Sequence, residues 1–133
     1  MPISEFVYHR RVQFPETDAS GIVHFTNFFK YVEEAEHALW RAAGLSIVPP
    51  GSEISFPRVA ASLEFHAPLR FEEEFEVLIR IAARTQRSIR YTTEITRGET
   101  KIATGTHTAA GGRKIPAPMK AIPIPQDIVE RLS

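Results

Sequence analysis

The residues with the clearest capacity for chemistry lie in one segment near the N-terminus, where Asp18 and Gly21 precede a strongly helical run. A carboxylate there is close to the start of a helix, whose first backbone N–H groups have no partner within the helix. Such N–H groups can stabilise an oxyanion while the carboxylate attacks a carbonyl carbon or activates a water molecule. Aspartate is also a common turn or capping residue. The segment therefore predicts either a reaction that builds negative charge or an ordinary turn before a helix.

The composition excludes several other kinds of chemistry. The 133 residues include no cysteine, which rules out disulfides, thiolate metal sites and a cysteine nucleophile. The histidines show no metal-ligand spacing, and the chain has neither a glycine-rich phosphate loop nor a Gly-x-Ser-x-Gly motif. Basic and acidic residues number 16 each, so nothing predicts bulk attraction to nucleic acid or to an anionic membrane. We expect no metal, no cofactor, no nucleic-acid partner and no membrane partner.

The length predicts one domain over residues 1–133, with enough chain for a real core. The N-terminus shows no signal peptide, and no apolar run approaches the ~18 residues of a membrane helix. The simplest expectation is a cytoplasmic location.

A long helix is predicted from about Thr26 to Ala43, with Gly44 as its stop. Its apolar face recurs at steps of three and four residues, at Phe28, Val32, Ala35, Leu39 and Ala42, and is widened by Phe29, Tyr31 and Ala38. Its polar face is predicted to carry Lys30, Glu33, Glu34, Glu36, His37 and Arg41. An apolar face this wide indicates that the helix lies against a broad sheet.

Five strands are predicted around this helix. The first holds Phe6, Tyr8 and Val12 to Phe14 and ends at Pro15. Four more follow the helix, with alternating apolar side chains in residues 59–65, 71–81, 89–95 and 102–109, and a tight turn at residues 97–99 joins the last two. The tail at residues 115–125 is predicted to be extended, before a last helical turn with Ile128, Val129 and Leu132 on one face. This order predicts an α+β fold with one long helix on a five-stranded antiparallel sheet.

The same topology predicts association between copies of the chain. A single helix cannot cover both faces of a five-stranded sheet, so the other face or an edge must meet solvent or a second subunit. Unpaired edge strands invite pairing. We therefore expect a homodimer or a larger homo-oligomer.

The loop and helix closely resemble the signature of the 4-hydroxybenzoyl-CoA thioesterase family, small acyl-CoA thioesterases of the hot-dog fold. Residues 17–24 read TDASGIVH, and residues 27–35 read NFFKYVEEA. Residues 65–71, FHAPLRF, resemble the family's connection between the second and third strands, and the proline-rich tail resembles its ending. The resemblance implies a helix wrapped by a curved sheet, dimers that often pair into tetramers, active sites at the subunit interface and an acyl-CoA substrate.

The resemblance also implies catalytic roles. Asp18 matches the family's catalytic carboxylate, which acts either as a nucleophile or as a general base. The backbone N–H of Phe25 matches its oxyanion donor. Gly21 is expected to let the backbone approach the substrate, or to be a turn glycine. His24 lies where the family often has His, Tyr or Trp, and is expected either to shape the thioester pocket or simply to pack.

Other residues of the helix are given supporting roles. Asn27 is predicted to lie beside the substrate and to cap the helix, with a hydrogen bond across the loop as the alternative. Because Asp18 already fills the carboxylate role, Glu33 is expected to support the substrate site and Glu34 to face solvent. Glu36 lies where relatives often carry Arg.

Basic side chains are expected to contact the phosphates of CoA. Arg84, Arg87 and Arg90 cluster between the third and fourth predicted strands, and Arg87–Ser88 resembles a step that the family uses near the nucleotide. We predict that Arg84, Arg87 and Ser88 bind CoA. The alternative is a solvated basic hairpin.

Two other functions fit the predicted fold. One is a hot-dog hydratase or dehydratase, although such enzymes typically use a histidine with a carboxylate in local patterns that this chain lacks. The other is a non-catalytic acyl-CoA-binding module, against which Asp18 argues. The sequence leaves open the acyl group and the choice between CoA and an acyl-carrier protein. Aromatic side chains that could line an acyl pocket, or belong to the core, are Phe25, Phe28, Phe29, Trp40 and Phe56.

Overall fold

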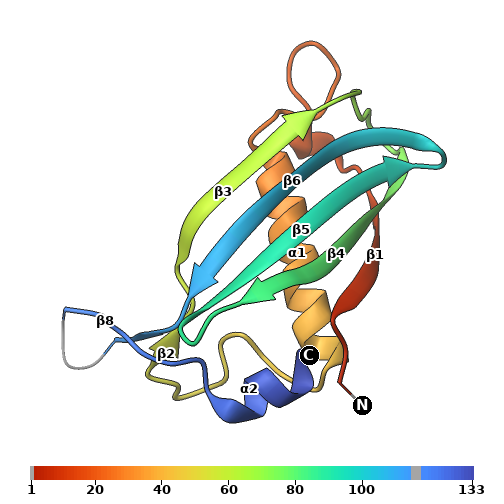
Figure 1. Ribbon diagram of the computed structural model, residues 1–133. Helices are drawn as coiled ribbons and strands as arrows, with labels where there is room; N and C mark the ends of the chain where they lie inside the picture. Colours follow the sequence, from red (N-terminus) through yellow and green to blue (C-terminus); the bar gives the residue numbers. More distant parts are fainter. Residues whose placement is uncertain (1, 115–117) are drawn as a thin grey trace.

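A curved five-stranded antiparallel sheet wraps one long helix in the computed structural model, which describes residues 2–114 and 118–133 (Figure 1). The elements run in the order β1 (Glu5–Arg11), the short 3-10 helix η1 (Phe14–Glu16), α1 (Asn27–Ala42), β2 (Ile54–Ser55), β3 (Arg58–Phe65), β4 (Glu74–Arg84), β5 (Ser88–Arg97), β6 (Thr100–Ala110), β7 (Gly112–Arg113), β8 (Lys120–Ala121) and α2 (Gln126–Arg131). The main sheet has the order β1-β4-β5-β6-β3. This is the hot-dog fold, and it confirms the predicted α+β class.

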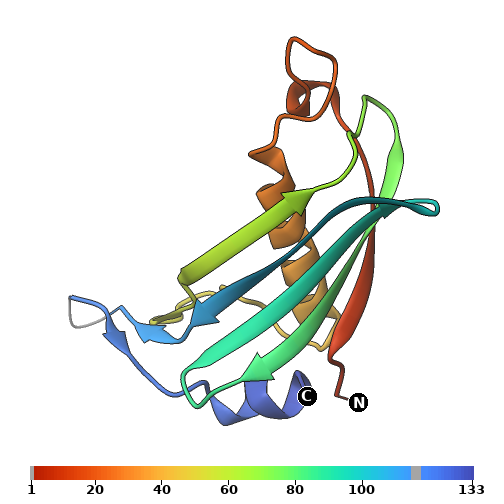
Figure 2. The ribbon, with the colours of Figure 1, turned by 45° about the horizontal axis from the view of Figure 1, so that its top comes forward.

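Helix α1 lies across the concave face of the main sheet (Figure 2). The apolar positions at steps of three and four, from Phe28 through Val32 and Ala35 to Leu39, are buried as predicted, whereas Ala42 is exposed. The facing strands contribute the alternating side chains that the sequence indicated, and those of β5, Ile89, Tyr91, Thr93 and Ile95, are all buried. Helix and sheet thus share one core.

The stop of α1 is as predicted. Gly44 has φ +79°, a left-handed conformation that suits glycine after the last helical turn. Its N–H donates to the carbonyl of Arg41 at 2.9 Å.

The structure corrects the predicted first strand at its end. β1 stops at Arg11, and Phe14 already belongs to η1, in which Pro15 follows it. The sequence predicted only that the strand ends at Pro15. The fixed φ of proline also suits the first turn of a helix, so the chain forms η1 at this position. Phe71 is also outside its predicted strand, since β4 begins at Glu74, and its ring packs edge-on against Phe14 with centroids 5.7 Å apart.

Strand β3 forms one edge of the main sheet and is largely exposed along its length. Val59 is 63% exposed and Phe65 is 46% exposed, although both have the alternation of buried strand positions. A strand with apolar side chains and one free hydrogen-bonding edge favours pairing with another chain.

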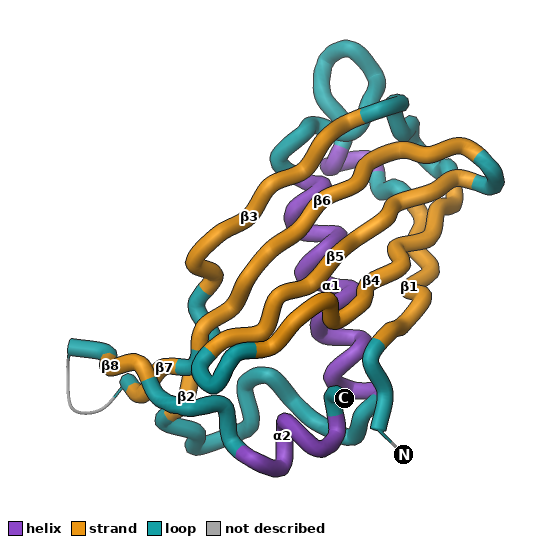
Figure 3. The backbone as a smooth tube through the Cα atoms, viewed as in Figure 1, coloured by secondary structure: helices purple, strands orange, loops and turns teal. Residues whose placement is uncertain are grey.

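A small second sheet was not predicted. β2, β7 and β8 pair in the order β2-β7-β8 beside the lower end of β6, and α2 lies next to it (Figure 3). Ile128 of α2 is buried, and Leu132, the first residue after α2, is fully buried. The predicted last helical turn is therefore confirmed. Residues 115–117, part of the predicted extended tail, lie outside the described residues.

Candidate active site

The loop that carries Asp18 is held closed by its own backbone. Asp18 N–H donates to the carbonyl of Ile22 at 2.9 Å, and Gly21 N–H donates to the carbonyl of Asp18 at 3.0 Å. Gly21 has φ +83°, which a residue with a Cβ rarely adopts, so the turn depends on glycine. Val23 N–H donates to the carbonyl of Leu69 at 2.8 Å and fixes the loop to the β3–β4 connection.

The Asp18 side chain is exposed at the tip of this loop. Its carboxylate accepts hydrogen bonds from the hydroxyl of Ser20 and, at 2.8 Å, from the backbone N–H of Ser20. These two bonds lower the pKa of Asp18 below its ordinary value, so the group is ionised at neutral pH. Asp18 therefore acts as a turn residue, one of the two roles that the sequence left open. Its carboxylate is nevertheless accessible and charged.

Glu16 anchors the start of the same loop, and sequence reasoning missed it. Its backbone carbonyl accepts from His24 N–H at 2.9 Å and from Asn27 Nδ2 at 2.8 Å. Its carboxylate accepts from the Tyr31 hydroxyl at 2.8 Å and from the guanidinium of Arg10. One residue thus ties the loop to β1 and to α1.

The electrostatics of Glu16 follow from these contacts. Burial acts to raise its pKa, but hydrogen bonds from Arg10, the Gln13 backbone and Tyr31 outweigh burial, so the pKa lies below its ordinary value. Burial and the Glu16 carboxylate together raise the pKa of Tyr31, which keeps that hydroxyl as a donor.

The backbone N–H of Phe25 has no hydrogen-bond acceptor within residues 2–114 and 118–133. It lies two residues before α1 begins, where backbone donors are not used by the helix itself. The Phe25 ring is 60% exposed and stacks on His24 with centroids 4.8 Å apart. The N–H that the family resemblance assigned to the oxyanion is therefore free to donate to a ligand.

His24 contacts the start of the helix rather than Asp18. Its Nδ1 lies 2.7 Å from the Thr26 hydroxyl and accepts from Thr26 N–H at 3.3 Å. No hydrogen bond joins His24 to Asp18 in the described part of the chain.

Asn27 does not cap α1, which corrects the favoured prediction. It is the first residue of the helix, and its side chain spans the loop to Glu16 instead. Glu33 is exposed at the rim of a pocket described below. Glu34 was expected in solvent, but it is half-buried and accepts from the Tyr8 hydroxyl and from Arg10 Nε, both at 2.9 Å.

The predicted CoA-binding residues lie at the opposite end of the sheet from Asp18. The Asp18 loop precedes the N-terminal end of α1, whereas Arg84, Arg87 and Ser88 surround the β4–β5 hairpin near α2 (Figure 3). β4 has 11 residues, so the two regions are separated by roughly 35 Å. Arg84 Nη1 donates to the carbonyl of Val129 at 2.8 Å, whereas Arg87 is exposed. One chain does not bring these residues to Asp18.

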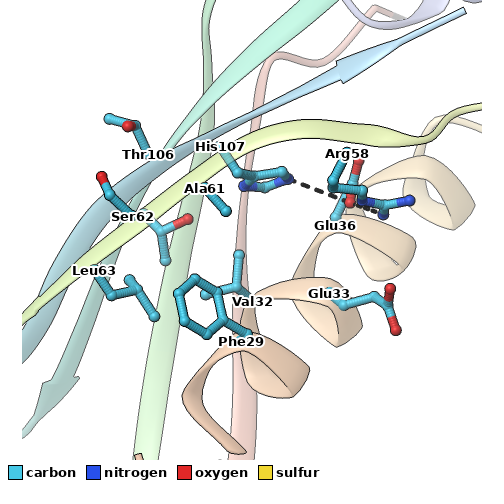
Figure 4. Close-up of a pocket in the computed structure, with 11 residues that line it drawn as sticks. Phe29, Val32, Glu33, Glu36, Arg58, Ala61, Ser62, Leu63, Thr106 and His107 are labelled. Atoms are coloured by element: carbon cyan, nitrogen blue, oxygen red, sulfur yellow. Dashed lines mark hydrogen bonds and ion pairs between the residues drawn. The ribbon is translucent and has the colours of Figure 1, made fainter. Parts of the chain in front are cut away.

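A pocket of about 210 Å³ lies between α1 and the strands β3 and β6 (Figure 4). Apolar side chains form much of its wall, and Glu36, Arg58 and His107 meet at one end. Glu36 is 0% exposed, so its predicted place on the polar face of the helix is wrong. Its Oε1 pairs with Arg58 Nη2 and lies 3.3 Å from His107 Nε2.

The charge of Glu36 is retained in this buried place. Burial acts to raise its pKa, and the neighbouring His107 and Arg58 outweigh it, so the pKa lies below its ordinary value. The His107 ring stacks on Tyr91 with centroids 4.6 Å apart, and the Tyr91 hydroxyl accepts from Trp40 Nε1 at 3.0 Å. The only sequence signal for this cluster was the acidic residue at a position where relatives often carry Arg.

Within the described ranges, no group of three or more His, Asp or Glu side chains is arranged to hold a metal ion. No helix there is long and apolar enough to cross a membrane.

Comparison with known proteins gives partial matches to curated proteins. A putative esterase from Aquifex aeolicus is 43% identical over 75 residues, which are 54% of this chain and 57% of that protein. A 1,4-dihydroxy-2-naphthoyl-CoA hydrolase from Crocosphaera subtropica is 34% identical over 64 residues, which are 47% of each. The chain thus spans about half the length of the curated relatives it matches.

A match to a solved structure covers nearly the whole chain. The solved structure of a gentisyl-coenzyme A thioesterase superimposes on this chain with a TM-score of 0.82, and the two sequences are 29% identical. The match covers 93% of this chain and 99% of that one. The model of the thioesterase superfamily matches residues 20–104, which is more than half of the chain and begins just after Asp18. These findings confirm the resemblance seen in the loop and helix motif, and the chain belongs to the thioesterase superfamily.

Proposed function

We propose that the protein is an acyl-CoA thioesterase that hydrolyses an acyl- or aryl-CoA thioester to the free acid and CoA. The observation that carries this proposal is an ionised, exposed Asp18 carboxylate in the same loop region as the free N–H of Phe25. The carboxylate supplies the attack, and the N–H stabilises the oxygen that becomes negative. Membership of the thioesterase superfamily supports the same reaction.

In the proposed reaction, the thioester carbonyl oxygen accepts the Phe25 N–H. Asp18 then acts in one of two ways. It attacks the carbonyl carbon, the C–S bond breaks with release of the CoA thiolate, and water hydrolyses the resulting anhydride; or it removes a proton from a water molecule that attacks directly. Single-turnover hydrolysis in ¹⁸O-labelled water separates the routes, because only the covalent route places label in Asp18.

Three observations support an aromatic acyl group. One relative is named for a dihydroxynaphthoyl thioester, and the matched structure is that of a gentisyl thioesterase. Exposed aromatic side chains also gather near the start of α1, where Phe25 is 60%, Phe29 is 39% and Phe65 is 46% exposed.

We also propose that the working enzyme is a homodimer or homotetramer with its active sites at the subunit interface. The exposed edge strand β3 supports this assembly. The wide separation of Arg87 from Asp18 within one chain supports it too, because a neighbouring subunit is then needed to bring basic side chains to the CoA.

A free-thiol release assay with a panel of aromatic, short-chain and long-chain acyl-CoA thioesters tests the activity. We expect thiol release, fastest with an aromatic thioester. Tight binding of acyl-CoA without thiol release would instead favour a binding module. Addition or loss of water without thiol release would favour a hydratase or dehydratase.

A further inference from the structure

The pocket beside α1 is a slot that follows the helix for about two turns. Phe29, Val32, Glu33 and Glu36 line it, and this spacing places all four on one face of the helix. Phe29 comes four residues after Phe25, so the slot begins near the proposed oxyanion donor and ends at Glu36. β3 and β6, together with Thr93 of β5, supply the opposite wall (Figure 4).

The slot holds an unusual concentration of unsatisfied polar atoms. Of the residues that the structure describes, three have a buried side-chain polar atom without a hydrogen-bond partner, namely Glu36 (Oε2), Thr93 (Oγ1) and His107 (Nδ1), whereas His107 Nε2 faces Glu36 Oε1 at 3.3 Å. All three line this slot, and none is more than 6% exposed. Buried polar atoms in folded proteins nearly always have a partner, because burying them without one is costly. Their clustering indicates a site for a polar group of a ligand.

The charges define what that polar group is. The negative charge of Glu36 is already balanced by Arg58, so an incoming ammonium group would leave an uncompensated positive charge. A carboxylate would meet Glu36 Oε2 with like charge. A neutral hydroxyl fits, because it can donate to Glu36 Oε2 and accept from Thr93 or His107.

The dimensions define how far this hydroxyl lies from the thioester. Glu36 comes eleven positions after Phe25, which corresponds to roughly 16 Å at the rise of a helix, and the Glu36 side chain leans back toward the N-terminus. A single-ring acyl group held at Phe25 would fall short of Glu36, whereas two fused rings extend far enough. The volume agrees, since a cavity of about 150 Å³ already holds benzene and this one measures about 210 Å³.

We propose that this slot is the acyl-group subsite, and that Glu36, with Thr93 and His107, selects an elongated acyl group with a neutral hydroxyl at the end distal to the thioester. This assignment rests on the proposed thioesterase function. Glu36 and His107 are specificity residues here and take no part in bond breaking.

Hydrolysis of 6-hydroxy-2-naphthoyl-CoA and of 2-naphthoyl-CoA tests the subsite, because the two thioesters differ only in the distal hydroxyl. In the wild type we expect kcat/KM to be at least about tenfold higher for the hydroxylated thioester, as fits a hydrogen bond to a charged acceptor. Glu36→Gln and Thr93→Val should each reduce that ratio. Glu130→Gln, an exposed carboxylate in α2, is the matched control and should leave the ratio unchanged.

The ratio of the two kcat/KM values is taken within one variant, so it does not depend on how much of that variant is folded. Equal kcat/KM for the two thioesters in the wild type would overturn the proposal. A ratio unchanged in both Glu36→Gln and Thr93→Val would overturn it too. Thr93→Val is nearly isosteric, so it retains the test if Glu36→Gln folds poorly.

A binding measurement separates this proposal from the proposed activity. Trp40 is the chain's one tryptophan and connects to the slot through Tyr91 and His107, so its fluorescence should report occupancy. The wild-type enzyme should bind 6-hydroxy-2-naphthoic acid at least about tenfold more tightly than 2-naphthoic acid. Thr93→Val should reduce this difference in affinity. This result would support the subsite even if no thioester were hydrolysed. Equal affinity for the two acids would overturn the subsite even if thioesters were hydrolysed.

Discussion

The backbone carbonyl of Glu16 accepts a hydrogen bond from the side chain of Asn27 at 2.8 Å. The same carbonyl accepts the N–H of His24 at 2.9 Å. Glu16 precedes the Asp18 loop and both donors follow it, so these two bonds close the loop at its base. The position of Asp18 relative to the Phe25 N–H therefore depends on a residue that is two positions away from the carboxylate.

Replacing Asn27 with Ala should loosen this closure. The change removes one of the two donors, so the free energy of unfolding should fall by about 1 kcal/mol. Because the carboxylate is then less well positioned, kcat should fall at least about threefold while KM stays the same. Steady-state kinetics and urea unfolding check both values, with Lys30→Ala on an exposed position of the same helix as control. A raised KM with unchanged kcat would show instead that Asn27 contacts the substrate.

Glu16 should make the fold sensitive to acid. Its folded-state pKa lies below the ordinary value of 4.5, so it contributes stability above that pH and loses the contribution as pH falls through the folded value. Glu16→Gln should be less stable than the wild type at pH 7, and should lose less stability between pH 5 and pH 3. Urea unfolding across this range checks the slope, with Glu99→Gln in the exposed β5–β6 turn as control. Parallel curves for wild type and Glu16→Gln would contradict this role.

Mixing subunits should reveal whether Arg87 serves a site in a neighbouring chain. At low substrate concentration, Asp18→Asn and Arg87→Ala should each be impaired alone. Suppose that one subunit supplies Asp18 and its neighbour in a dimer supplies Arg87. About half of the dimers refolded from a 1:1 mixture then contain both variants, and each of these has one intact site, so the mixture should recover about a quarter of wild-type activity. Activity equal to the average of the two parents would place the residues in separate functions. An unchanged KM in Arg87→Ala alone would remove it from CoA binding.

The sequence was sufficient for the parts of the fold that depend on local periodicity. The steps of three and four in α1, the glycine stop at Gly44 and the alternation in β5 are each set by side chains that lie close in the chain, and the structure confirms all three. The choice of the Phe25 N–H as oxyanion donor is of a different kind, because it came from the resemblance to the thioesterase family.

The parts that failed depend on residues far apart in the chain. Glu36 follows the polar pattern of its helix, but it is buried because Arg58 and His107, 22 and 71 positions later, arrive from β3 and β6. The alternation in β3 predicted buried side chains. β3 is an edge strand, however, so Val59 is 63% exposed, and Phe65 is still 46% exposed although its ring packs against Phe28 of α1. Periodicity reports which side chains share a face and carries no information about what covers that face.

The Asp18→Asn variant in the thiol-release assay tests the central claim most directly. Asn keeps the size of the side chain and an acceptor for the Ser20 hydrogen bonds, so we expect the variant to fold with an unchanged circular dichroism spectrum and melting temperature. It loses the carboxylate that attacks or activates water, so kcat for the best acyl-CoA should fall at least about 10²-fold. A folded Asp18→Asn variant with wild-type turnover would contradict the account.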